Sequence, residues 1–91
     1  MNILCFDVYS DPGHAWVKVP KSRMKRFFGD HWRKEFSCCS FERKDHVYLE
    51  EDKDASTFVQ RLRDNGITPD WRQHHTDRCS RIRNYPPLAP R

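Results

Sequence analysis

The stretch "NILCFDVYSDPGHAWVKVP", residues 2–20, decides the fold of this 91-residue chain. Residues 2–10 are dense in Ile, Leu, Phe, Val and Tyr, which is typical of a strand. Residues 11–13, Asp-Pro-Gly, predict a tight turn, because proline fixes φ and glycine accepts a positive φ. Apolar and polar side chains alternate along residues 14–19, so the sequence predicts a second strand that pairs back on the first as a hairpin.

Two helices are predicted after the hairpin. The first covers residues 20–28, because the N–H that proline lacks would be unpaired at the first helical position anyway, and Gly29 marks its end. The second covers residues 55–65 and ends at Asn65-Gly66. Apolar side chains recur three or four residues apart in both helices and form one stripe on each. These are Met24, Phe27 and Phe28 in the first helix, and Phe58, Val59 and Leu62 in the second.

Three further strands are predicted at residues 36–41, 47–50 and 67–75, the last at a sheet edge because it contains Pro69. The resulting order predicts an α+β fold, in which a small antiparallel sheet carries two helices on one face. The nearest named topology is a ferredoxin-like split βαβ with an N-terminal hairpin. One domain, residues 1–91, is expected, with an irregular, basic, Pro-rich C-terminal segment at residues 76–91.

Charge is unevenly spread along the chain, whose net charge is +4. Residues 18–44 contain nine basic and three acidic residues, a local charge of +6, whereas residues 45–54 contain one basic and five acidic residues, a local charge of −4. A dipolar surface of this kind favours oriented docking with a charged partner. The total charge is modest for a dedicated duplex-DNA binder.

No segment suggests a membrane or an export signal. No apolar run approaches the roughly 18 residues that a spanning helix needs, and "MNILCF" at the start lacks the basic region of a signal peptide. The four cysteines are therefore predicted to be free thiols in a reducing cytoplasm.

Three motifs carry a resemblance to a known group of proteins. They are "YSDPGHAW" at residues 9–16, "YLEED" at residues 48–52 and "SRIRNY" at residues 80–85. As a set they resemble a family of small proteins encoded by tailed bacteriophages and prophages, which share YSDPGHxW, YLEED and SxIRxY-type motifs. The resemblance implies a viral accessory protein that works in the cytoplasm of the host bacterium. It also implies stoichiometric binding, in which the protein inhibits a host protein, such as a defence protein, or sequesters a small molecule.

The candidate binding residues lie at the two ends of the chain. If the last strand lies beside the first hairpin, imidazoles, guanidinium groups and tyrosine rings converge, and they suit a phosphate- or carboxylate-bearing ligand or an acidic protein surface. The alternative is structural, with Ile82 and Tyr85 packed on the sheet and the arginines paired locally. The candidate set is Tyr9, Asp11, His14, His74, His75, Arg78, Arg81, Arg83 and Tyr85.

An alternative function is nucleic-acid binding through residues 18–34, where cations are interleaved with Phe27, Phe28 and Trp32. Cations with aromatic rings suit single strands, through phosphate contacts and base stacking. The competing interpretation is an amphipathic helix whose aromatic side chains face the core. The cations concerned are Lys18, Lys21, Lys25, Arg26, Arg33 and Lys34.

Metal, cofactor and catalytic sites are not predicted. Zinc ligands normally stand two to five residues apart, whereas Cys38-Cys39 and His74-His75 are adjacent pairs, which point to opposite faces of a strand. No cysteine and histidine spacing singles out a nucleophile, and the acidic run at residues 50–54 is expected to cap the following helix. A non-enzymatic protein is therefore expected, with a host protein, an anionic small molecule, nucleic acid or a second copy joined through the sheet edge as the partner.

Overall fold

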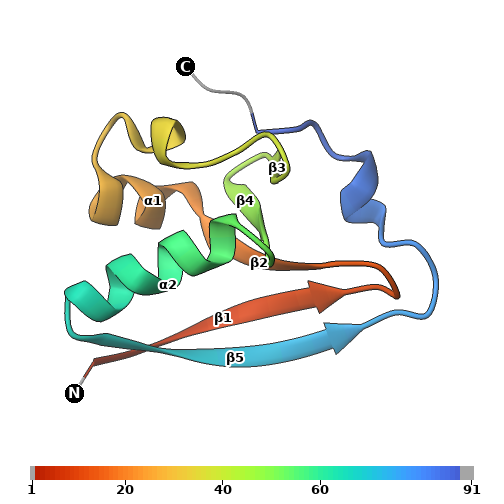
Figure 1. Cartoon of the computed structure of the whole chain (residues 1–91), viewed down its shortest axis with the longest axis horizontal. Helices are drawn as coiled ribbons and strands as arrows, with labels where there is room; N and C mark the ends of the chain where they lie inside the picture. The colour runs from red at the N-terminus through yellow and green to blue at the C-terminus, as the bar shows by residue number, and fades with distance from the viewer. Residues whose placement is uncertain (1, 89–91) are drawn as a thin grey trace.

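The computed structural model describes residues 2–88, which form one five-stranded sheet with two α-helices and two 3-10 helices (Figure 1). The strands lie in the order β3-β4-β2-β1-β5. Along the chain the elements are β1 (Asn2–Ser10), β2 (Ala15–Pro20), α1 (Lys21–Phe28), η1 (Trp32–Glu35), β3 (Phe41–Arg43), β4 (His46–Glu50), α2 (Asp54–Asp64), β5 (Ile67–His75) and η2 (Arg81–Asn84). The α+β class and the N-terminal hairpin agree with the sequence prediction.

The sheet is mixed rather than antiparallel, which corrects the prediction. β1 pairs antiparallel with β2, and β2 with β4, so β1 and β4 run the same way. The helix α2 then carries the chain back across the sheet, and β5 starts again in the direction of β4. β5 is therefore parallel to β1, from Asn2 opposite Ile67 to Ser10 opposite His75. β5 stands at the sheet edge, as its proline suggested, and the ferredoxin-like arrangement stays a prediction.

One face of the sheet carries the main core and both α-helices (Figure 1). Alternate strand residues such as Phe6, Val17 and Leu49 point into it. Met24 from α1 and Phe58 from α2 are fully buried against them. The apolar stripes read from the sequence therefore pack in this core, except for Val59, which is only partly buried and does not belong to the core cluster. This burial is the main favourable term for the fold.

Among residues 2–88, the C-terminal segment covers part of the opposite face. Ile82 of η2 is buried against Trp16 and Tyr48, which are strand residues of that face. Further along, the Glu42 N–H donates to the Pro86 carbonyl at 2.9 Å, and the Leu88 N–H donates to the Ser40 carbonyl at 2.8 Å. The part of the segment at residues 76–88 is thus fixed to the sheet, although it contains little regular structure.

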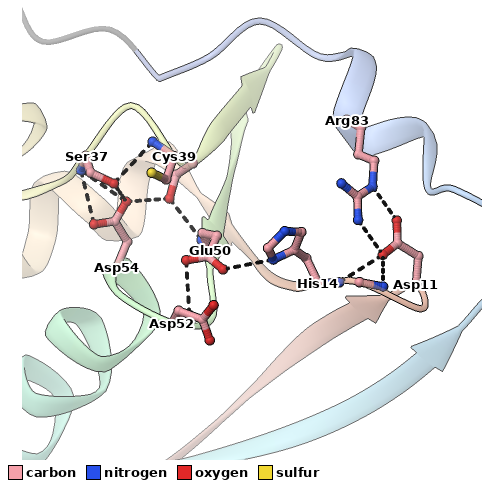
Figure 2. A network of polar contacts seen from close by, with 10 residues as sticks. Asp11, His14, Ser37, Cys39, Glu50, Asp52, Asp54 and Arg83 are labelled. Atoms are coloured by element: carbon pink, nitrogen blue, oxygen red, sulfur yellow. Dashed lines mark hydrogen bonds and ion pairs between the residues drawn. The ribbon is translucent and has the colours of Figure 1, made fainter.

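The predicted strand at residues 36–41 is wrong, because residues 36–40 form turns around a buried carboxylate. Both oxygens of Asp54, at the start of α2, accept the Ser37 N–H, and one also accepts the hydroxyls of Ser37 at 2.8 Å and Ser40 at 2.5 Å (Figure 2). The Ser40 oxygen in turn accepts the Glu50 N–H at 2.9 Å. Asp54 was expected to cap its own helix, but its carboxylate instead ties the turn, β4 and α2 together.

Replacing Asp54 by alanine is expected to destabilise the protein strongly. The buried Ser40 hydroxyl and the partly buried Ser37 N–H would be left without this acceptor, which costs about 3 kcal/mol of unfolding free energy. Urea denaturation measures this. Asp64→Ala is the control, because Asp64 is exposed at the other end of α2 and accepts only from Gln60. Equal midpoints for the two variants would contradict the assignment.

Candidate functional site

The carboxylate of Asp11 joins the β1–β2 turn to the C-terminal segment (Figure 2). One oxygen accepts the N–H groups of Gly13 and His14 at 3.0 Å each, which shapes the turn. The other accepts the Ser80 N–H at 2.9 Å. Arg83 closes the set with a fork, Nε at 2.6 Å and Nη2 at 2.8 Å. The Asp11 side chain is completely buried by these partners.

These contacts fix the charge states of the pair. The Arg83 hydrogen bonds, followed by the Ser80 N–H, hold the pKa of the Asp11 carboxyl far below its usual range. The same contacts raise the pKa of the Arg83 guanidinium. A Cβ at position 13 would lie 2.8 Å from the Arg83 Nη2 atom, so a larger residue there would displace this end of the guanidinium group. Asp11 and Arg83, both predicted as ligand-binding residues, are therefore occupied with each other.

The C-terminal segment lies against the sheet beside the β1–β2 hairpin, and a pocket lies where they meet. A cavity of about 690 Å³ separates the C-terminal segment from the open face of the sheet. Four cationic side chains and three tyrosines line this "cationic pocket", and none of its described lining residues is acidic. They are Lys18, Arg43, Arg78, Arg81, Tyr9, Tyr48 and Tyr85.

Two of the pocket's cations, Arg78 and Arg81, remain available for a ligand. Arg78 and Arg81 are exposed, and neither forms an ion pair with any residue between positions 2 and 88. Arg43 lies over the Tyr85 ring, 5.1 Å from its centre, and donates to the Tyr85 hydroxyl at 3.2 Å. Burial raises the pKa of Tyr48, so its hydroxyl is protonated and able to donate at neutral pH.

Four of the nine predicted binding residues line this pocket: Tyr9, Arg78, Arg81 and Tyr85. The histidines lie outside it. The His74 Nε2 is 2.9 Å from Asp7, and its ring stacks on Tyr9 with centroids 4.7 Å apart. The His75 Nε2 is 3.2 Å from Asp77. His14 faces Glu50 on the far side of η2, with its Nδ1 3.5 Å from a carboxylate oxygen.

Sequence reasoning missed Arg43 and Tyr48 and assigned Lys18 only to nucleic-acid binding. A signal existed in the strand alternation, because Lys18 and Tyr48 both fall on the face opposite the main core and are paired across β2 and β4. They line a pocket because the C-terminal segment folds back over that face. No local sequence pattern predicts this tertiary contact.

The basic stretch proposed for nucleic acid does not form one surface. Glu42 lies 2.8 Å from Lys21 and 2.8 Å from Arg33, which hold the pKa of its carboxyl to about 2, with the Arg33 hydrogen bond as the main cause. Trp32 is buried beneath Arg33, and Phe27 and Phe28 pack against the core. Three of the cations named for this role remain exposed: Lys25, Arg26 and Lys34.

The cysteines are exposed free thiols. Within residues 2–88, neither they nor His74 and His75 belong to a group of three or more metal-ligating side chains; the group found there is His14, Glu50 and Asp52. No helix in the same range is long and apolar enough to cross a membrane. Comparison of the chain with protein-family models, with curated proteins and with solved structures finds no match.

Asp11→Asn is expected to release the C-terminal segment from the sheet, because the amide cannot accept the Arg83 fork with two oxygens. Limited trypsin digestion should then cut at Arg78, Arg81 and Arg83 several-fold faster than in the unaltered chain. Asp77→Asn is the matched control, since the Asp77 side chain is almost fully exposed. Unchanged cleavage rates in Asp11→Asn would refute the role of the carboxylate as the tie.

Acid should weaken the fold through two carboxylates. The folded-state pKa values of Asp11 and Glu42 lie below their ordinary values of 3.8 and 4.5, so both contribute stability that is present above those values and is lost as the pH falls below them. For Glu42 the loss extends to about pH 2. Urea titrations from pH 7 to pH 2 should show a shallower decline for Glu42→Gln than for the unaltered chain; parallel curves contradict this.

Proposed function

We propose that this protein is a non-enzymatic binding protein that captures an anionic small molecule stoichiometrically in the cationic pocket. The observation that carries the proposal is the grouping of Lys18, Arg43, Arg78 and Arg81 around one cavity whose described lining contains no carboxylate. Lys18 stands opposite Asp7 in the strand pairing, whereas Arg43, Arg78 and Arg81 form no ion pair within residues 2–88. Like charges without counter-charges repel one another, and an anion relieves that repulsion. The volume of the cavity is in the range of small-ligand sites.

The lining favours a ligand with phosphate or carboxylate groups. Guanidinium forks bind such oxygens with two parallel hydrogen bonds, and both Arg78 and Arg81 project from the same short segment. The tyrosine hydroxyls add neutral donors, and the rings of Tyr48 and Tyr85, 5.1 Å apart, provide an apolar wall. A ligand that joins an anionic group to a flat ring would use both features.

Binding rather than turnover is proposed for the same pocket. Cys79 is the one cysteine in its described lining, and no histidine lines the pocket beside it to activate the thiol. The resemblance to small phage proteins suggests a setting, the cytoplasm of an infected bacterium, in which sequestering a host metabolite or occupying a host protein is useful to the virus. The cavity favours the small ligand over the protein, because a protein surface does not require one.

A homodimer through β5 is a subsidiary proposal. β5 pairs on one side only, with β1, and its residues 70–75 are exposed. Unpaired N–H and C=O groups at such an edge support strand addition. The nucleic-acid alternative is less favoured, since two of its cations form ion pairs with Glu42 and the aromatic rings it needs pack against the core.

Inorganic pyrophosphate is the first probe of the pocket, titrated by calorimetry at low salt. Arg81→Gln should weaken its binding at least tenfold, about the value of one charge-assisted hydrogen bond. Arg63→Gln is the control, because Arg63 is exposed on α2, which covers the other face of the sheet.

Equal effects of Arg81→Gln and Arg63→Gln would show that only net charge matters and would contradict the pocket. Absence of pyrophosphate binding, with an acidic host protein captured through Arg78 and Arg81, would replace the small ligand by a protein partner.

A further inference from the structure

A second cavity of about 730 Å³ lies across η2 from the cationic pocket, and the two share no lining residue. His14, Trp16, Glu50 and Asp52 line it (Figure 2 shows the three ligating side chains). One donor atom from each of His14, Glu50 and Asp52 lies within 4.8 Å of the other two. The site is thus separate from the one that the proposed function uses.

Strand pairing gathers these side chains. Glu50 is the last residue of β4 and stands opposite Trp16 of β2. His14 comes directly before β2, and its N–H is held by Asp11 at 3.0 Å. Asp52 follows in the next turn, where its N–H donates to the Glu50 Oε2 at 3.1 Å. The three ligands therefore come from two elements whose positions the sheet fixes.

Only one of the two oxygens of the Glu50 carboxylate accepts a hydrogen bond from a described residue. Glu50 is more than nine-tenths buried, and its Oε1 has no hydrogen-bond partner among the described residues. That atom faces His14, with 3.5 Å between it and the Nδ1. A buried carboxylate oxygen without a partner is costly and rare in stable proteins. A cation between Glu50 and His14 would satisfy it.

We propose that His14, Glu50 and Asp52 bind a divalent transition-metal ion, with Zn²⁺ as the best fit. A tetrahedral ion held at about 2.1 Å by its ligands has edges of about 3.4 Å between them, close to the 3.5 Å between His14 Nδ1 and Glu50 Oε1. The imidazole favours zinc over Mg²⁺ and Ca²⁺, which prefer oxygen alone. Asp52 is exposed and reaches the third position by rotating its side chain.

The surroundings agree with a dication. Two carboxylates and a neutral imidazole carry a charge of −2, which Zn²⁺ balances. Arg83 and the exposed Lys53 also line the cavity, and Asp11 already neutralises Arg83. The Trp16 Nε1 is a second buried polar atom without a partner among the described residues, and it is a donor. The fourth coordination position is then open to a water molecule or an anion, whose oxygen can accept from Trp16.

The test uses the full chain with all four cysteines replaced by serine, because exposed thiols bind zinc on their own. Titration with zinc chloride at pH 7.5, followed by calorimetry and native mass spectrometry, should give one ion per chain. His14→Gln and Glu50→Gln should each weaken binding at least about 100-fold, since loss of an outer-shell partner alone costs up to that factor. Glu51→Gln, an exposed neighbour of Glu50, is the matched control and should leave the affinity unchanged.

The His14 variant keeps the test decisive if Glu50→Gln fails to fold, because the His14 side chain is nearly half exposed. Zinc should also raise the melting temperature of the cysteine-free chain but not that of the His14 variant. Loss of zinc binding in the cysteine-free chain, or equal affinity in His14→Gln and Glu51→Gln, would overturn the proposal. Neither result depends on pyrophosphate binding, so the metal site and the cationic pocket are tested independently of each other.

Discussion

The ion pair between Asp11 and Arg83 is the contact on which both cavities beside η2 depend. It joins a turn near one end of the chain to a 3-10 helix near the other, and it is buried on the Asp11 side. Because the same carboxylate also accepts backbone N–H groups from the turn and from Ser80, one residue fixes the shape of the hairpin and the position of η2 together. A buried carboxylate with all its partners in place is stable, whereas losing one partner leaves the others unmatched.

The position of η2 creates two sites from one face of the sheet. Ile82 sits between Trp16 and Tyr48 and fills the middle of that face, so the space on either side of it becomes a separate cavity. One side collects unpaired guanidinium groups and tyrosines, and the other collects an imidazole and two carboxylates. The short segment therefore keeps the cations of the cationic pocket apart from the carboxylates of Glu50 and Asp52, and Lys53 and Arg83 line the second cavity beside those carboxylates.

The hydrogen bonds of the buried Asp54 carboxylate help to fix the other end of the C-terminal segment. It holds the turn at residues 36–40, and the Ser40 carbonyl there receives the N–H of Leu88, whose side chain is buried in the main core. The C-terminal segment is thus fixed at both ends, by Arg83 at the hairpin and by Leu88 at the helical face. This arrangement explains how a segment with so little regular structure can form the wall of a pocket.

The sequence by itself determined the elements that local physics controls. The hairpin with its Asp-Pro-Gly turn and the two helices each depend on neighbours within a few residues, and these predictions are confirmed, although Val59 of the predicted helix stripe lies outside the core. Tertiary structure decided the rest: β5 is parallel because α2 crosses over the sheet, and residues 36–40 turn because Asp54 accepts their hydrogen bonds. Tertiary structure also decided which arginine forms the ion pair with Asp11. Arg81 and Arg83 look alike in "SRIRNY", but only one reaches Asp11, 72 positions away in the chain, and no local pattern encodes a contact of that range.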